Sequence, residues 1–444
     1  MKRKISAYLT EWKEQKSSKP LMILGCRQVG KTYSVREFIS ENYESFLEIN
    51  LEREPKMAEI FNGDLDARSV IDRLLIVSGK ELTPGKSAIF IDEIQSSQNA
   101  LSSLKWLAED GRFDIIVSGS YLGTRLQEDD ERISPMGYVT VKTMYPMDFE
   151  EFMWAMGTDE RMIDSVRKSI ADLQPLDSVF NEKISNLFRR YLVVGGMPEA
   201  VKTYSETGNY VKTREVIKDI ITILNADVGR YSKRTDRMKI LSCIGSIPSQ
   251  LASDKRRFEY SAIEKKIGLG KSQYGDALEW LISSGMAYRC YNLRGIIPPL
   301  SQNVNLKSFK MYLCDTGILL GLMDDADVGA IVSSDPFANN GIVMENAVAC
   351  SLIAKGYPLY YYAKENSTLE IDFILNTKEI DLIDMKSFRN KKSKSLSTLL
   401  AEKNTGRRGI KLCEEGVYAD MNGIVHLPLY GTWFLPDSGV PDID

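Results

Sequence analysis

The stretch Gly25-Cys26-Arg27-Gln28-Val29-Gly30-Lys31-Thr32 matches the pattern G-x-x-x-x-G-K-[ST]. It follows the apolar run PLMILG and opens a segment with helical character. Gly25 and Gly30 let backbone N–H groups wrap around phosphate oxygens. Lys31 supplies a positive charge, and Thr32 offers a hydroxyl to Mg²⁺. Because a strand precedes the loop and a helix follows it, the sequence predicts a site for ATP and Mg²⁺ rather than a glycine-rich turn without a ligand.

Further apolar runs follow the loop in alternation with helical segments. SFLEINLE (45–52), SAIFIDEI (87–94) and FDIIVSGS (113–120) read as strands, which indicates a parallel α/β sheet covered on both faces. Ligands bind at the carboxyl ends of such strands. There Asp92 would hold Mg²⁺, directly or through water, and Glu93 would polarise the attacking water. Ser118 and Ser120 end the next strand, where a contact with the γ-phosphate or water and a plain Ser-Gly-Ser turn are equal alternatives.

Beyond this core the sequence predicts three more domains. Residues 151–226 read as a mostly helical domain, interrupted by VVGGMPEAV, where the glycines and the proline demand a turn. Residues 227–320 contain SAIEKKIGL, GKSQYGDALEWLISSGM and AYRCYNL, which read as the helix, turn, helix and wing of a winged helix. Residues 335–444 begin with a helix near Met344–Lys355 and continue with strands. The predicted fold class is therefore multi-domain α/β, with a P-loop core over residues 1–150.

Composition and charge limit the function classes. The chain has 444 residues, 43% hydrophobic and 27% charged, and no apolar run reaches the roughly 18 residues of a membrane helix. Six scattered cysteines without a CxxC pair, one histidine and no signal peptide favour a reducing cytoplasm and exclude His-rich metal sites. The net charge is −4, but residues 227–310 hold 15 Lys+Arg against 7 Asp+Glu, and residues 386–411 hold 9 against 1. This asymmetry indicates that these two segments meet an anion.

The predicted winged helix offers basic and polar groups for such a contact. Lys271, Ser272 and Gln273 would open its recognition helix, and Lys255-Arg256-Arg257 lies on a nearby loop. Lysine and arginine at these places would contact phosphates and raise affinity without reading the sequence. A winged helix that serves only domain packing or protein contact stays an equal alternative.

Five segments together resemble a known family. LMILGCRQVGKT, IFIDEIQ, IIVSGSYLG, YPMDFEEF and YLVVGGMPEAV occur in the order found in bacterial and archaeal AAA-type ATPases that carry a C-terminal domain of unknown function. The resemblance covers nearly the whole chain. It implies an ATP-binding module, a helical lid, a winged helix and a restriction-endonuclease-like end. One position departs from the family: Gly137-Tyr138 stands where relatives have Gly-Arg, which leaves Arg125 and Arg132 as substitutes in hydrolysis.

The segment from Glu370 to Lys386 forms a candidate hairpin in the last domain. With three or five residues in the connection, Asp372 falls directly opposite Asp384, and Lys386 shares the face of Asp384. This D…DxK arrangement resembles the PD-(D/E)xK nucleases, and the resemblance implies Glu345 as an extra acid. Asp372, Asp384 and Glu345 would then hold Mg²⁺, and Lys386 would stabilise the charge on a scissile phosphate. A nuclease-like fold kept for packing, its acids held in salt bridges, remains open.

The sequence thus predicts a cytoplasmic protein that binds and hydrolyses ATP with Mg²⁺ and acts on or with nucleic acid, DNA rather than RNA. No membrane contact is expected. The alternative is a nucleotide-dependent switch that binds a protein partner and uses its C-terminal domains as scaffold.

Overall fold

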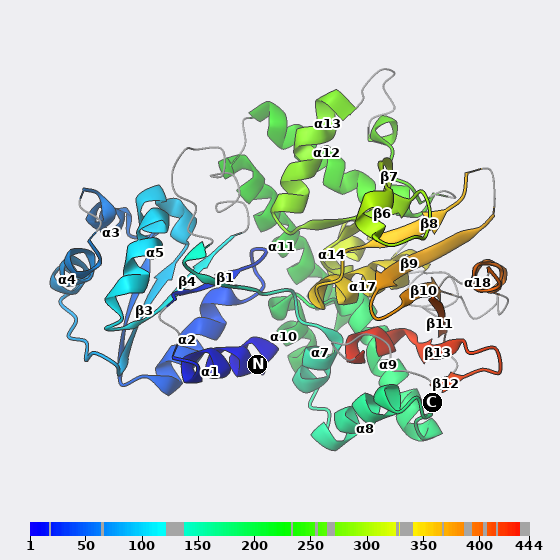
Figure 1. Ribbon diagram of the computed structural model, residues 1–444. Coiled ribbons are helices and arrows are strands. Elements are labelled where there is room, and N and C mark those ends of the chain that lie inside the picture. Colours follow the sequence, from blue (N-terminus) through cyan, green and yellow to red (C-terminus); the bar gives the residue numbers. More distant parts are fainter. Residues whose placement is uncertain are drawn as a thin grey trace. The chain divides into compact units, whose positions relative to one another are not determined.

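The structure is a computed structural model that describes most of the chain. It covers residues 1–16, 19–63, 66–120, 137–231, 234–253, 256–263, 271–325, 328, 341–365, 368–385, 393–402, 406–413 and 416–435, without the side chains of 229–231, 234–235 and 271–272. The chain folds into two compact units (Figure 1). The first contains residues 1–145 with 283–285, and the second contains residues 146–282 with 286–444.

A five-stranded parallel sheet organises the first unit. Its order is β2-β3-β4-β1-β5, and every adjacent pair is parallel. The strands are β1 (Leu21–Leu24), β2 (Ser45–Asn50), β3 (Ser87–Asp92), β4 (Asp114–Gly119) and β5 (Thr140–Thr143). Apart from the outer β2 and β5, they are apolar and buried on both faces, as predicted for a parallel sheet.

Helices cover both faces of this sheet (Figure 1). The helices α4 (Ala67–Ser78) and α5 (Gln98–Asp110) pack on one face, in a core cluster that includes Ile71, Leu104 and Ile91. The connection through α2 (Lys31–Asn42) runs in the opposite direction along the sheet, so right-handed crossovers place α2 on the other face, beside α1 (Lys4–Glu14). The short α3 (Pro55–Ala58) follows β2. The parallel α/β core predicted from the sequence is confirmed.

The second unit begins with helices. They are α7 (Phe149–Ala155), α8 (Glu160–Ala171), α9 (Ser178–Val194), α10 (Pro198–Thr207), α11 (Tyr210–Tyr231), α12 (Arg234–Leu251) and α13 (Lys271–Ser283). The turn between α9 and α10 contains the predicted Gly-Gly pair: Gly195 has φ +75°, and a Cβ on Gly196 would lie 2.0 Å from the Met147 carbonyl oxygen. The Gly196 N–H donates to the buried Asp315 carboxylate at 2.5 Å. Only glycine fits this close approach.

One eight-stranded sheet holds the rest of the second unit together. Its order is β12-β13-β11-β10-β9-β8-β6-β7. The strands are β6 (Ala287–Leu293), β7 (Val304–Leu313), β8 (Tyr360–Ala363), β9 (Glu370–Asn376), β10 (Ile380–Met385), β11 (Arg407–Cys413), β12 (Tyr418–Ala419) and β13 (Val425–Pro428). The helices α14 (Thr316–Gly321), α17 (Gly341–Ala354) and α18 (Lys394–Leu400) connect these strands.

The antiparallel pair β6 and β7 follows α13, and residues 264–269 of the first helix predicted for the winged helix lie outside the described residues. The structure adds that β6 also pairs in parallel with β8, so a single sheet takes strands from both residues 227–320 and residues 335–444. An aromatic cluster joins the helical segment to the C-terminal residues, since Phe188 on α9 packs against Tyr430 and Trp433. The helices and the last sheet of the second unit therefore share one core.

Candidate functional site

The loop between β1 and α2 is closed by its own lysine. Gly30 has φ +91° at the start of α2, and a Cβ on Gly25 would lie 2.2 Å from the Met144 carbonyl oxygen, so both glycines are required by the backbone. The Lys31 Nζ donates to the carbonyl oxygens of Gly25 at 2.9 Å and Cys26 at 3.0 Å. Burial lowers the pKa of the Lys31 ammonium, although Glu93 and Asp92 oppose this shift. A phosphate would give this buried cation a charged partner.

Asp92, at the carboxyl end of β3, is the centre of a polar network. Its Oδ2 accepts from the Thr32 hydroxyl at 3.0 Å and from the Asn50 Nδ2 at 2.9 Å. Its Oδ1 accepts from the Ser118 hydroxyl. The ends of β2 and β4 and the phosphate loop therefore converge on the carboxylate at the end of β3. A carboxylate and a hydroxyl are the hard oxygen ligands that Mg²⁺ prefers, so Thr32 and Asp92 fit a magnesium ion bound with nucleotide.

The next two predicted residues lie at the same edge of the sheet. Glu93 directly follows β3 and has φ +54°, an uncommon value that turns the chain away from the strand. Its carboxylate accepts from the Gln95 side-chain amide. Ser120 lies just beyond β4 and is 5% exposed, and its hydroxyl has no hydrogen-bond partner among the described residues. A buried hydroxyl at this edge is suited to a bound ligand.

Sequence reasoning missed three residues of this site. Asn50 ends β2 and lies in register with Asp92, so the rule that located Asp92 at a strand end also applies to it. Gln95 holds Glu93, two residues along the chain. Arg3 donates to the carbonyl oxygens of Val29 and Tyr145, each at 2.8 Å, which ties the N-terminus to the phosphate loop. No local pattern marks Arg3, since both contacts are distant in sequence.

Tyr138, at the position where the family resemblance leads one to expect arginine, is 39% exposed, and the Lys105 Nζ lies 5.0 Å from its ring centroid. The two suggested substitutes, Arg125 and Arg132, lie outside the described residues.

The connection of the C-terminal hairpin has an odd number of residues, as the predicted opposition of Asp372 and Asp384 requires. β9 and β10 are antiparallel with Ile383 opposite Phe373, and three residues connect them. The next pair in this register is Asp384 and Asp372, on the same face of the sheet. Both side chains are buried, and the Asp372 Oδ2 accepts from the Met385 backbone N–H at 2.7 Å. The paired register ends at Ile383 and Phe373, so the opposition of Asp384 and Asp372 stays a prediction, and Lys386 lies outside the described residues.

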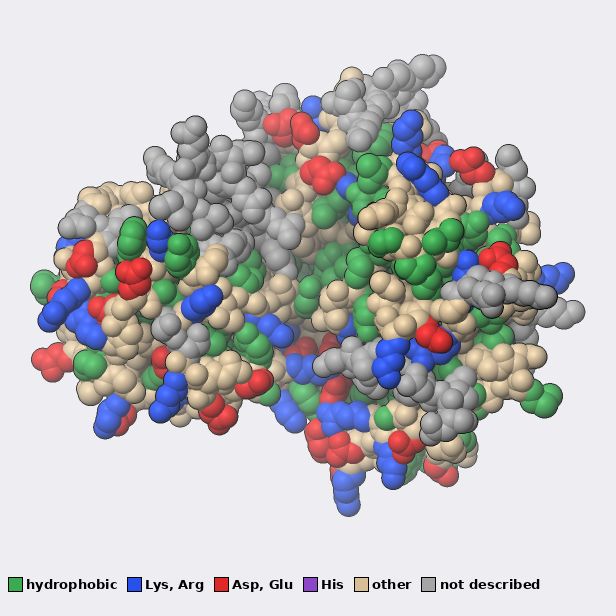
Figure 2. Space-filling view, in the orientation of Figure 1, with side chains coloured by type: hydrophobic (Ala, Val, Ile, Leu, Met, Phe, Trp, Pro, Cys, Tyr) green, Lys and Arg blue, Asp and Glu red, His purple; other side chains and the backbone are tan. Residues whose placement is uncertain are grey.

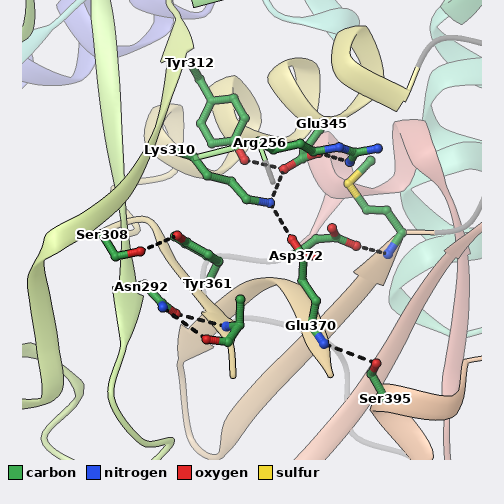
Figure 3. A network of polar contacts seen from close by, with 12 residues as sticks. Arg256, Asn292, Ser308, Lys310, Tyr312, Glu345, Tyr361, Glu370, Asp372 and Ser395 are labelled. Carbon is green, nitrogen blue, oxygen red and sulfur yellow. Dashed lines mark hydrogen bonds and ion pairs between the residues drawn. The ribbon is translucent and has the colours of Figure 1, made fainter. Parts of the chain in front are cut away.

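Glu345, on α17, is enclosed by cationic and phenolic donors (Figure 3). Its Oε1 accepts from the Lys310 Nζ at 2.8 Å and from the Tyr312 hydroxyl at 2.5 Å. Its Oε2 accepts from the Arg256 guanidinium. The Lys310 Nζ donates a second hydrogen bond to the Glu370 Oε1, at 2.9 Å. Lys310 and Glu345 are 0% and 1% exposed, so this is an ion pair inside the protein.

The charged groups of this cluster shift one another's pKa values. Burial alone would raise the pKa of Glu345, but the Lys310 ammonium and the Arg256 guanidinium outweigh it and hold that pKa below its usual range. Burial would lower the pKa of Lys310, but Glu345 and Glu370 hold it above its usual range. Burial, and then the Glu345 charge, raise the pKa of Asp372. Glu345 and Lys310 are therefore both charged at neutral pH.

The cluster does not present a ready metal site. Among the described residues no group of three or more His, Cys, Asp or Glu side chains is placed to hold a metal ion. The oxygens of Glu345 are directed at Lys310, Tyr312 and Arg256 instead of at Asp372 and Asp384. As arranged, Glu345 does not fit the role of a magnesium ligand, and the assignment of Asp372 and Asp384 to a metal stays a prediction.

Some of the lysines and arginines counted in the segments 227–310 and 386–411 are buried or paired inside the protein. Lys310 is fully buried and Arg256 is bound to Glu345, while Arg408 pairs with the buried Asp381. Gln273 is exposed, and Arg257 is half-buried and paired with Glu259. Lys255 and the side chains of Lys271 and Ser272 lie outside the described residues. Figure 2 shows basic and acidic side chains interspersed over the face drawn. The sequence count therefore overstates the charge that these segments offer to an anion.

Lys310 and Tyr312 were also missed as members of the C-terminal cluster. Ser308, Lys310 and Tyr312 alternate with apolar residues along β7, and all three are buried. A lysine on the polar face of an otherwise buried strand signals a buried counter-charge. The partner carboxylate lies 35 residues away, so the signal does not identify it.

Comparison with known families assigns part of the chain. Residues 17–153 match an AAA domain. Residues 185–327 match a domain of unknown function (DUF8612), and residues 340–430 match a domain of unknown function (DUF4143). The first match agrees with the parallel sheet and the phosphate loop, and residues 17–153 are a P-loop domain of the AAA ATPase type. No curated protein sequence matches the chain.

Several solved structures share a distant likeness. The Aeropyrum pernix ORC2 protein is 13% identical with a TM-score of 0.34, over 74% of this chain and 93% of that chain. The Thermotoga maritima RuvB Holliday junction branch migration motor is 13% identical with a TM-score of 0.32, over 65% and 90%. C. elegans PCH-2 is 14% identical with a TM-score of 0.27, over 46% and 62%. Scores this low support no conclusion about this chain. No helix within the described ranges is long and apolar enough to cross a membrane.

Proposed function

We propose that this protein binds ATP with Mg²⁺ and hydrolyses it. The convergence of Thr32, Asn50 and Ser118 on the Asp92 carboxylate carries this proposal. Bound Mg²⁺ would neutralise charge on the β- and γ-phosphates. Lys31 would leave the loop carbonyls and pair with the phosphates, Thr32 and Asp92 would hold the ion, and Glu93 would orient the attacking water. Gln95 keeps the Glu93 carboxylate at the edge of the sheet.

The proposed macromolecular partner is nucleic acid, DNA rather than RNA. The support is the surplus of Lys and Arg in residues 227–310 and 386–411, together with the helix α13 followed by the antiparallel pair β6 and β7. Binding through phosphates would weaken steeply with salt, because each phosphate neutralised releases close to one counterion. The competing proposal is a nucleotide-dependent switch for a protein partner, with the second unit as scaffold.

A second candidate activity is Mg²⁺-dependent cleavage of phosphodiesters at Asp372 and Asp384. The observation in its favour is the antiparallel pairing of Ile383 with Phe373, which would set these two carboxylates opposite each other if it continued by one residue. A cation between them would relieve their repulsion. Lys386 is the proposed stabiliser of the phosphate charge. Glu345 enters this proposal only if it is released from Lys310 and Arg256.

One assay separates these proposals. We expect purified wild-type protein to release phosphate from ATP with Mg²⁺ but not with EDTA, at a rate that changes when plasmid DNA is added. Plasmid integrity is followed in the same tube, and Asp384→Ala is expected to abolish any nicking while it leaves phosphate release unchanged. Phosphate release that is indifferent to DNA would favour the switch. If nicking survives in Asp384→Ala, the nicking activity comes from another site or from a contaminant.

A further inference from the structure

The Lys310 side chain occupies the place of a cation among the C-terminal carboxylates (Figure 3). Its ammonium lies 2.8 Å from the Glu345 Oε1 and 2.9 Å from the Glu370 Oε1. The ring of Tyr361 lies 4.9 Å away. A fully buried ammonium is tolerated only where carboxylates compensate for its lost hydration. Here β7 supplies the cation, while α17 and β9 supply the anions.

Arg256 completes the enclosure of Glu345 from another part of the chain. It lies in the loop after α12, has φ +48°, and binds the oxygen that Lys310 does not use. The backbone of α17 is fixed beside β7 as well, because the Asn346 side chain donates to and accepts from the Leu313 backbone at 3.0 and 2.8 Å. Both oxygens of Glu345 are therefore occupied, by residues of the segment 227–320.

A divalent cation cannot bind Glu345 while Lys310 and Arg256 occupy both of its carboxylate oxygens. Mg²⁺ requires ligand oxygens at about 2.1 Å, directed at the ion. The Glu345 oxygens are directed at protein donors, and a metal at the cluster would lie next to the Lys310 ammonium. Two like charges separated by a few ångströms in a buried place repel strongly.

We propose that Lys310 and Arg256 form a latch that holds Glu345 away from any divalent cation, so that the C-terminal carboxylates are charge-compensated without metal. Release of the latch frees Glu345 to join Asp372 and Asp384. This regulation rests on the proposed carboxylate site and is independent of the ATPase proposal. Because Lys310 lies on β7 and ends the segment 227–310, which is proposed to meet nucleic acid, a shift of that strand is the event that would open the site.

The test measures Mn²⁺ binding by the loss of the free-ion paramagnetic resonance signal. Lys310→Ala removes the charge and leaves room for a hydrated ion, and is expected to bind one additional Mn²⁺ about tenfold or more tighter than wild type. Lys307→Ala, an exposed change on the same strand, is the matched control and should behave as wild type. Adding Asp384→Ala to Lys310→Ala should remove the additional ion. ATP turnover should be unchanged, which keeps this test separate from the ATPase proposal.

Two results would overturn the latch. In the first, wild type binds Mn²⁺ at an Asp384-dependent site as tightly as Lys310→Ala. In the second, folded Lys310→Ala gains no ion. Should Lys310→Ala fail to fold, Arg256→Ala replaces it, because the Arg256 side chain is 37% exposed and its removal leaves the buried pair in place. Arg256→Ala is expected to gain a weaker Mn²⁺ site, and the absence of any gain would overturn the proposal.

Discussion

Glu93→Gln is expected to bind ATP nearly as wild type does and to release phosphate about 100-fold or more slowly. Glutamine keeps the size of the side chain and a hydrogen bond to Gln95, but its neutral amide cannot draw a proton from the attacking water. Loss of a positioned base costs roughly 10²–10⁴-fold in rate. Steady-state phosphate release and equilibrium nucleotide binding, measured on the same preparation, give the two values.

The matched control for this variant is Glu44→Gln. Glu44 is in the same unit, and its side chain is 62% exposed in a surface pair with Lys86, so turnover should be unchanged. Equal turnover by Glu93→Gln and wild type would remove Glu93 from the reaction. Absence of phosphate release from wild type, with or without nucleic acid, would instead favour the switch and would point to Tyr138 in place of arginine as the reason.

Glu345→Gln is expected to destabilise the second unit by about 3–5 kcal/mol, the usual cost of removing one partner of a buried ion pair. The loss removes the carboxylate that Arg256 binds and leaves Lys310 paired with Glu370, whose side chain is 43% exposed. The midpoint of thermal unfolding should fall by roughly 10 °C. Glu379→Gln, an exposed change in the neighbouring hairpin connection, should leave the midpoint unchanged. An unchanged midpoint in Glu345→Gln would contradict the ion pair.

The ion pair of Glu345 with Lys310 also determines the direction in which stability changes with pH. The pKa of Glu345 in the folded protein lies below the 4.5 of an ordinary glutamate. The unfolded chain therefore binds this proton more readily than the folded protein does. The contribution of Glu345 to stability is complete above that ordinary value, and it is lost as the pH falls below it. Glu345→Gln should consequently lose less stability relative to wild type in acid than at neutral pH.

The nucleotide site was predictable because its chemistry is local in sequence. The spacing of Gly25, Gly30, Lys31 and Thr32 fixes one backbone conformation, and an acid at the end of a buried strand must lie at the ligand edge of a parallel sheet. The hairpin register was predictable as well, because a three-residue connection determines which residues oppose. Each of these deductions uses only neighbours along the chain or the period of a strand.

The environment of Glu345 was not predictable in the same way. Its donors come from β7 and from the loop after α12, and only the completed eight-stranded sheet brings them to α17. Lys310 and Arg256 both fall in the basic segment 227–310 that we expected to meet an anion, because a count of charges carries no information about burial. An isolated acid on an apolar helix is compatible with a metal and with a lysine, and long-range packing selects between them.

The central claim is that the edge formed by Lys31, Thr32 and Asp92 binds ATP with Mg²⁺, and calorimetric titration of wild type and Lys31→Ala tests it most directly. The account predicts one ATP per chain for wild type, tightened by Mg²⁺. It predicts an affinity for Lys31→Ala lower by about 1.5–3 kcal/mol, the value of a charge-assisted hydrogen bond to phosphate. Equal heats and equal affinities for the two proteins, or no binding to wild type, would contradict the claim.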